Sequence, residues 1–335
     1  MRSAVLGLIL TSAALAQTGY HVTKRIPVGG DGGWDYLMVD NAARRLYVSH
    51  ATEVDVIDAD NGTVAGKITG LKGVHGIALA PEFNRGFISN GQAGTVTVFD
   101  LKTLKRIGDD LPAGKNPDAI IYDSATGRIF VFNGGSSNAT VIDAELGVAV
   151  GTVTLEGKPE FGVADGANAV FVNIEDKNSI MRIDSRKLLV EQRWALAPCE
   201  EPSGIAMDRS GRRIFSGCHN KMMAVLDADS GKVVTTVPIC DGIDATWFDS
   251  ETAMVYNSCS DGTITAIHQD SPNEYKVVDT IKTQSGSRTM ALDSKTHKLF
   301  VPAAEYEAPA APPAEGQRPR RKMVPGSFSV LVLEK

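Results

Sequence analysis

A block of about 42 residues recurs seven times along this chain of 335 residues. In each copy an apolar run rich in Val, Ile and Phe ends at a turn. The turn residue is aspartate in six copies and proline in the second: Asp40, Pro81, Asp123, Asp165, Asp208, Asp249 and Asp293. All-strand repeats of this length cannot each bury a core, so they close into a ring of blades. The sequence therefore predicts an all-β fold, a seven-bladed β-propeller of four-stranded antiparallel blades.

The seventh copy is one strand short, because its third strand, residues 328–333, runs almost to the C-terminus. Residues 20–28 precede the first copy, belong to no blade and resemble a fourth strand. We expect this N-terminal strand to complete the seventh blade and close the ring, which removes the exposed edges of an open sheet.

The first 16 residues have the pattern of an export signal. Arg2 precedes an apolar run at residues 5–10, and residues 14–16 supply a small-residue cleavage site. The run is too short to span a bilayer. We therefore expect the mature chain, residues 17–335, to be periplasmic or secreted, to contain no membrane span and to be a monomer.

Charge and composition disfavour nucleic acid as a partner. The formal net charge is -6, and aromatic residues make up 6% of the chain. A negative surface repels phosphate backbones, and base stacking needs exposed rings in a basic groove. A small molecule or a protein at one face of the ring is the expected partner.

One segment departs from the repeat. Residues 303–326 interrupt the seventh copy with several prolines and a basic cluster at Arg318, Arg320, Arg321 and Lys322. Such a composition cannot build a core. We expect a surface loop here, or alternatively a lid or partner-docking arm above the channel.

The best candidate site is the end of the central channel where the innermost strands begin, which we call the mouth. The residues five and six positions before each turn residue should line it. The charged and titratable ones are Asp35, His75, Asp118, Glu160, Asp244 and Arg288. They are our candidate ligand-binding residues.

Two interpretations of these mouth residues stay open. Clustered carboxylates raise one another's pKa or hold a cation, so a divalent cation or a small ligand could bind among them. Alternatively they are structural, accepting backbone hydrogen bonds while Arg288 neutralises two of them. The sequence identifies no cofactor and assigns no metal ligand.

The four cysteines repeat in register. Cys199 and Cys240 each lie nine residues before a turn aspartate, and Cys218 and Cys259 each lie ten after one. In an exported protein this spacing favours the disulfides Cys199–Cys218 and Cys240–Cys259, each within one blade. The alternatives are a cross-blade pair of Cys218 with Cys240 and a metal site that includes Cys218, His219 and Met222.

Several segments resemble a known family. They are residues 47–50 (YVSH), 171–173 (FVN), 56–58 and 141–143 (both VID), 32–36 (GGWDY), 217–220 (GCHN) and 287–293 (SRTMALD). In these the chain resembles the YVTN-repeat propellers of bacteria and, more closely, the exported YncE-like proteins. The resemblance implies the propeller fold over residues 20–335. It implies little about activity. Some members bind single-stranded DNA, a property that the acidity of this chain argues against.

Fold alone does not assign chemistry, so we carry three functional hypotheses. We favour an exported binding or protein-interaction module that acts through the mouth, rather than an enzyme. The alternative is a lactonase-type or lyase-type enzyme, in which Arg288 holds an anionic group of the substrate and His75 or Glu160 transfers a proton. In the third hypothesis the ring is a rigid platform for another protein.

Overall fold

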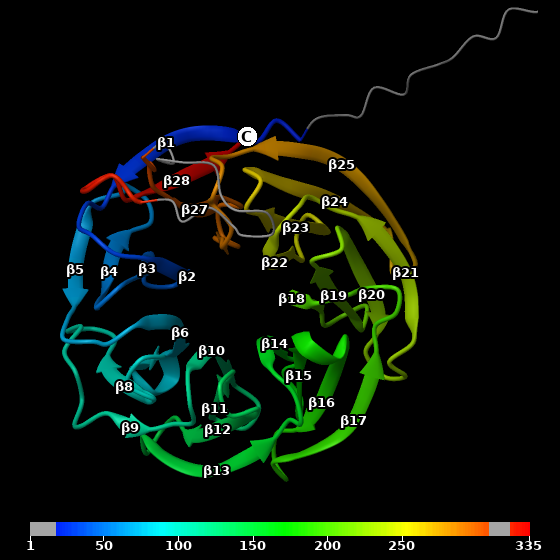
Figure 1. Ribbon diagram of the computed structural model, residues 1–335, viewed down its shortest axis with the longest axis horizontal. Coiled ribbons are helices and arrows are strands. Elements are labelled where there is room, and N and C mark those ends of the chain that lie inside the picture. The colour runs from blue at the N-terminus through cyan, green and yellow to red at the C-terminus, as the bar shows by residue number, and fades with distance from the viewer. Residues whose placement is uncertain (1–17, 308–321) are drawn as a thin grey trace, which may run out of the picture.

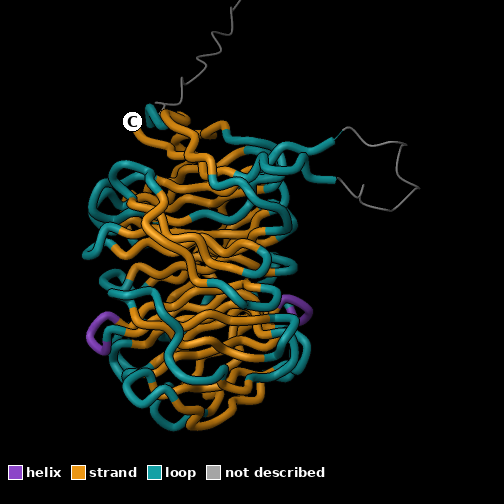
Figure 2. The backbone as a smooth tube through the Cα atoms, turned by 90° about the vertical axis from the view of Figure 1, so that its left-hand side faces the viewer, coloured by secondary structure: helices purple, strands orange, loops and turns teal. Residues whose placement is uncertain are grey.

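The computed structural model describes residues 18–307 and 322–335. Seven four-stranded antiparallel sheets stand as blades around a central channel (Figure 1), and the ring forms a thick disc in side view (Figure 2). The predicted all-β seven-bladed propeller is confirmed. The predicted signal at residues 1–16 lies outside the described residues, as do Arg318, Arg320 and Arg321 of the insertion.

Blades 1 to 4 follow one another along the chain, each from its innermost strand outward. Blade 1 comprises β2 (Trp34–Asp40), β3 (Arg45–His50), β4 (Glu53–Asp58) and β5 (Val64–Ile68). Blade 2 comprises β6 (Val74–Ala80), β7 (Arg85–Asn90), β8 (Thr95–Asp100) and β9 (Leu111–Pro112). Blade 3 comprises β10 (Pro117–Asp123), β11 (Arg128–Asn133), β12 (Asn138–Asp143) and β13 (Val148–Thr154). Blade 4 comprises β14 (Pro159–Ala164), β15 (Ala169–Ile174), β16 (Ser179–Asp184) and β17 (Leu189–Ala195).

Blades 5 to 7 complete the ring, together with two short 3-10 helices, η1 (Pro81–Phe83) and η2 (Glu175–Lys177). Blade 5 comprises β18 (Pro202–Asp208), β19 (Arg213–Cys218), β20 (Met222–Asp227) and β21 (Val233–Pro238). Blade 6 comprises β22 (Ile243–Asp249), β23 (Met254–Cys259), β24 (Thr263–Ser271) and β25 (Glu274–Lys282). Blade 7 comprises β26 (Ala291–Leu292), β27 (Leu299–Ala303), β28 (Ser329–Glu334) and β1 (His21–Pro27).

The N-terminal strand closes the ring, as predicted. β1 pairs antiparallel with β28 from His21 opposite Glu334 to Pro27 opposite Ser329. Ile26 is buried in the core of this blade, and the hydroxyl of Tyr20 donates to the backbone oxygen of His297 at 2.7 Å. The two ends of the described chain therefore share one sheet.

The turn aspartates accept hydrogen bonds from backbone N–H groups of their own turns. Oδ1 of Asp40 accepts hydrogen bonds from the N–H groups of Ala42 and Ala43 at 3.0 and 2.8 Å, which is the local bonding that makes aspartate favourable in turns. The corresponding aspartates of the other blades do the same. In blade 2 proline replaces the aspartate, and Pro81 begins η1 instead. The most regular feature of the sequence is thus structural.

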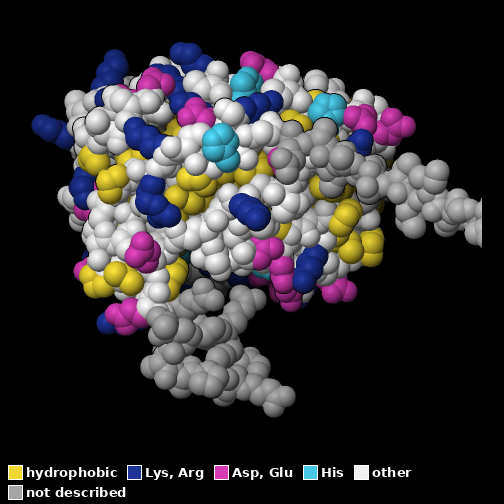
Figure 3. All heavy atoms as spheres, turned by 90° about the horizontal axis from the view of Figure 1, so that it is seen from above, with side chains coloured by type: hydrophobic (Ala, Val, Ile, Leu, Met, Phe, Trp, Pro, Cys, Tyr) yellow, Lys and Arg dark blue, Asp and Glu magenta, His cyan; other side chains and the backbone are white. Residues whose placement is uncertain are grey.

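An aromatic ring holds each blade against its neighbours. At one equivalent position the second strand of every blade carries a fully buried ring: Tyr47, Phe87, Phe130, Phe171, Phe215, Tyr256 and Phe300. Burying such a ring contributes roughly 2 to 3 kcal/mol. On the outside, acidic and basic side chains are interspersed over the rim (Figure 3). In the described residues no helix is long and apolar enough to cross a bilayer.

Candidate functional site

A β-bulge in six of the innermost strands places the candidate side chains at the mouth. The register against the second strand shifts within Trp34–Leu37, Val74–Ile77, Pro117–Ile120, Pro159–Gly162, Pro202–Ile205 and Ile243–Ala245. Five of the predicted residues lie inside these shifts: Asp35, His75, Asp118, Glu160 and Asp244. A bulge redirects a side chain out of the regular alternation. The spacing in the sequence located these residues, but not the bulge itself.

Buried hydroxyls of neighbouring strands hold the bulges in place. Ser49 accepts a hydrogen bond from the N–H of Asp35 at 2.8 Å. Ser89 accepts from the N–H of Gly76 at 2.8 Å and donates to the backbone oxygen of Asp118 in the next blade. Both serines are fully buried. The backbone of the site is therefore fixed before any ligand binds.

Asp35, His75 and Asp118 form the tightest cluster of the mouth. Nδ1 of His75 lies 2.6 Å from Asp35 and 3.6 Å from Asp118. One ligand atom from each of the three residues lies within 4.8 Å of the others, a spacing suited to a metal ion. Nε2 of His75 faces Gly91, where a Cβ would come within 2.5 Å of it. The glycine therefore leaves room for the imidazole to turn Nδ1 toward the carboxylates.

The other cations of the mouth are already paired with carboxylates. Arg288 lies 3.1 Å from Asp244 and 3.9 Å from Asp35, as the structural interpretation of the sequence expected. Lys158 lies 2.6 Å from Glu160 and also pairs with Glu175. Both cations serve two carboxylates at once, so each leaves its partners incompletely neutralised.

Burial raises the pKa of three carboxyl groups at the mouth. It raises the pKa of Asp118 to about 6, and the charge of Asp35 adds to the effect. Burial likewise raises the pKa of Asp244 to about 7. The pKa of Glu160 rises to about 8 through burial, although Lys158 donates a hydrogen bond to it. Each raised pKa means that ionisation of the carboxyl group is unfavourable. A positive charge bound nearby would stabilise the carboxylate form.

The raised pKa of His75 also indicates that a positive charge is favourable at this cluster. Burial lowers the pKa of its imidazole, but the hydrogen bond with Asp35 and the charge of Asp118 outweigh burial and raise it. The two carboxylates therefore favour a positive charge at the position of the imidazole proton. A metal ion bound to Nδ1 would place its charge there instead.

One cavity of about 840 Å³ collects most of these groups. Asp35, Asp118, Glu160, Asp244 and Arg288 line it, whereas His75, which contacts Asp35, is not among the lining residues. Sequence reasoning missed the other titratable lining residues: Tyr36, Lys158, Glu175, His219, Asp241, Asp261 and Tyr306. Tyr36 directly follows Asp35 and Lys158 lies two residues before Glu160, whereas the rest come from loops and from η2, which the inner-strand count does not reach.

The two disulfides lie beside this cavity. Cys199 bonds Cys218 with 5.7 Å between Cα atoms, and Cys240 bonds Cys259 with 5.8 Å. The favoured pairing within blades is confirmed, and the cross-blade pair of Cys218 with Cys240 is wrong because both sulfurs are bonded elsewhere. The same bond removes Cys218 as a thiolate ligand, so the alternative metal site with His219 and Met222 is not formed.

The base of the insertion reaches the mouth. Ala303 is the last residue of β27, and beyond it Tyr306 pairs with Met323 in an isolated β-bridge. Tyr306 lines the cavity, and its ring lies 6.2 Å from that of Trp34. Tyr306 thus brings the base of the insertion to the mouth.

The fold and its mouth define a seven-bladed β-propeller, closed by its N-terminal strand, with a carboxylate-rich cavity at one end of the channel. Over 93 residues the chain is 33% identical to the uncharacterized protein YncE of Salmonella typhimurium and to that of Salmonella typhi. The match covers 27% of this chain and 26% of those proteins. The seven-bladed fold is consistent with the YncE-like family. No family model matches the chain.

A structural comparison agrees on the fold. A chain of hydrazine synthase from Kuenenia stuttgartiensis superposes with a TM-score of 0.69, covering 88% of this chain and 96% of that one. The two are 15% identical in sequence. At that identity the likeness shows a shared fold and carries no chemistry.

Proposed function

We propose that this protein is an exported binding module whose mouth binds a small cationic ligand, in the first instance a divalent metal ion. The observation that carries the proposal is the convergence of Asp35, His75 and Asp118 within metal-ligand distance, beside a cavity lined by more carboxylates than cations. Imidazole and carboxylate together suit ions such as Zn²⁺ and Mn²⁺. Export rests on residues 1–16 and is tested by N-terminal sequencing of the protein from the culture or periplasm.

Calorimetric titration tests the proposal directly. Metal-free protein at neutral pH is titrated with Zn²⁺ and with Mn²⁺, and we expect saturable binding of one ion per chain. Asp241→Asn is the matched control, because Asp241 lines the same cavity outside the cluster and pairs with Lys221. Binding that is absent, or that weakens as much in this control as in Asp35→Asn, would contradict the proposal.

One observation favours an enzyme as the second candidate. Glu160 has a pKa raised to about 8 and lies in the cavity, so near neutral pH it holds a proton that a general acid could donate. Arg288 is less suited to an anionic substrate, because Asp244 and Asp35 already flank it. A lactone screen that shows turnover in the parent and none in Glu160→Gln would favour this alternative.

The platform hypothesis has a separate test. Tyr306 brings the base of the insertion to the mouth, so a protein partner could contact both. If the ring is a platform, deleting residues 304–325 removes capture of that partner and leaves metal binding intact. If the mouth is a ligand site alone, the deletion changes access and therefore the rate of metal binding.

A further inference from the structure

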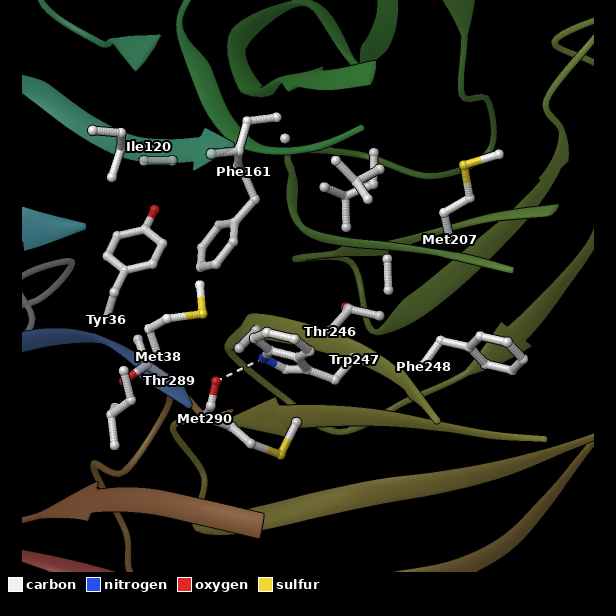
Figure 4. Close-up of a pocket in the computed structure, with 18 of the residues that line it drawn as sticks. Tyr36, Met38, Ile120, Phe161, Met207, Thr246, Trp247, Phe248, Thr289 and Met290 are labelled. Atoms are coloured by element: carbon white, nitrogen blue, oxygen red, sulfur yellow. Dashed lines mark hydrogen bonds between the residues drawn. The ribbon is translucent and has the colours of Figure 1, made fainter. Parts of the chain in front are cut away.

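A second cavity, of about 530 Å³, occupies the central channel below the mouth. Its wall is mostly apolar and aromatic (Figure 4), with Tyr36, Met38, Ile120, Phe161, Trp247 and Met290 among the lining residues. Its size falls in the range of small-molecule sites, which are typically apolar with few polar groups. Nothing in the proposed function of the mouth uses this space.

The polar groups of Trp247, Thr246 and Thr289 in the wall already have hydrogen-bond partners. Nε1 of Trp247 donates to the backbone oxygen of Met290 at 2.7 Å (Figure 4). The hydroxyl of Thr246 donates to Asn257 at 3.0 Å, and that of Thr289 to the backbone oxygen of Asp35 at 2.7 Å. A molecule in the channel would therefore meet apolar surface, methionine sulfur and aromatic faces, so its buried part must itself be apolar.

Two rings separate this channel from the mouth. Tyr36 of blade 1 and Phe161 of blade 4 meet with ring centroids 4.5 Å apart. Tyr36 lines both cavities, so it stands at their boundary. At the opposite end the lining includes the exposed turn residues Arg209, Ser210 and Ser250. Entry to the channel is therefore from the face that carries the turns.

A guanidinium stands at this entrance. Nε and Nη2 of Arg209 donate to the backbone oxygen of Ala164 at 3.1 and 2.9 Å, and no ion pair of Arg209 is formed within the described residues. Its neighbour Asp208 is buried and accepts from Ser210, Gly211 and Gln269. The exposed charge that a ligand meets at the entrance is thus positive.

We infer that the channel is a second binding site, for an amphipathic small molecule with an apolar, preferably aromatic, body and one anionic group. The body lies between Trp247, Met38 and Met290, and the anionic group lies at the entrance beside Arg209. The inference does not rest on cation binding at the mouth, because the rings of Tyr36 and Phe161 lie between the two cavities.

Two fluorescent probes that differ in charge test the inference. 1-Anilinonaphthalene-8-sulfonate has an aromatic body with one sulfonate, and N-phenyl-1-naphthylamine has the same kind of body without it. With the full-length protein we expect saturable, blue-shifted fluorescence from one site per chain. Arg209→Gln should weaken the sulfonate probe at least fivefold and the neutral probe less than twofold. Lys295→Gln removes a cation from another turn on the same face and should change neither.

Blocking the entrance separates the channel from the outer surface. Ser250→Trp places a large ring at the entrance and should weaken both probes at least tenfold. Ser124→Trp is the matched control, since Ser124 is the exposed residue after the turn aspartate of blade 3 and does not line the channel. Equal effects of the two substitutions, or probe binding that does not saturate, would overturn the inference. Thermal unfolding of each variant checks that the ring is intact.

Discussion

The mouth and the channel are built from the same innermost strands, yet they offer opposite environments. On β14 Glu160 belongs to the mouth and the adjacent Phe161 to the channel, and on β22 Asp244 and Trp247 divide in the same way. In each of these strands the bulge includes the mouth residue. On both strands the charged residue of the mouth precedes the aromatic residue of the channel along the chain.

The difference teaches that one propeller axis can hold two kinds of ligand chemistry. At the mouth the carboxylates outnumber the cations, and three of them have raised pKa values. In the channel the wall is mostly apolar, and the polar groups of Thr246 and Trp247 are already bonded. Four predictions test whether the two regions are as separate as this comparison holds.

The largest expected effect comes from removing two charges of the mouth. Asp35→Asn with Asp118→Asn should weaken metal binding at least a thousandfold, about 4 kcal/mol, because neutral amides replace two of three ligands. Affinity for the sulfonate probe of the channel should change less than twofold. Calorimetry and fluorescence titration measure the two. A similar loss at both regions would break the separation.

The pH dependence of stability should also arise from the mouth. Asp244 and Glu160 have pKa values of about 7 and 8 when folded, above their usual 3.8 and 4.5. At a pH between the unfolded and the folded pKa of each group, the folded chain binds more protons than the unfolded chain. The free energy of unfolding therefore falls as pH rises. From pH 5 to 8.5 we expect the free energy of unfolding to fall by several kcal/mol, because each group loses about 1.4 kcal/mol per pH unit up to its folded pKa.

Denaturant unfolding across that pH range provides the measurement. The pair Glu160→Gln and Asp244→Asn should flatten the slope, since neither amide titrates. A parent protein whose stability rises between pH 5 and 8.5, or a double variant with an unchanged slope, would show that these carboxyls do not resist ionisation.

The disulfides should stabilise the mouth side of blades 5 and 6. Each closes a loop with a sequence separation of 19, for which loss of chain entropy predicts about 3 kcal/mol of stability. Cys240→Ser with Cys259→Ser should lower the free energy of unfolding by that amount. In hydrogen exchange the loss of protection should concentrate near Asp241 and Asp261, and uniform loss around the ring would contradict a local role.

The smallest effect concerns the boundary itself. Phe161→Ala removes one of the two rings that separate the regions and should cost about 2 kcal/mol, because the ring is partly buried. Metal affinity should stay within twofold of the parent, since the ring offers the mouth no charge. A tenfold change in metal affinity would mean that the boundary also shapes the mouth.

Much of the fold could be predicted because it repeats. The turn aspartates recur with a nearly constant period, and counting back from them found Asp35, Asp118, Glu160 and Asp244 at the cavity. Ring closure by residues 20–28 followed from one missing strand. Each of these inferences needed only spacing along the chain.

The rest of the site depends on contacts that spacing does not encode. Glu175 reaches the mouth from η2 and His219 from the turn after β19, so neither shares the inner-strand pattern. The channel cavity could not be predicted from the sequence, because apolar residues that line a cavity have the same pattern as apolar residues that fill a core. Tyr36 divides the two cavities only because Phe161 meets it across the axis.

Anomalous scattering from crystals of the protein soaked in Mn²⁺ tests the central claim most directly. We predict one strong peak at the mouth, within coordination distance of Asp35, Asp118 and Nδ1 of His75, and no peak there in the Asp35→Asn, Asp118→Asn protein. A mouth without a peak in the parent crystals, while ions bind elsewhere on the ring, would contradict the proposal that this cluster binds a divalent cation.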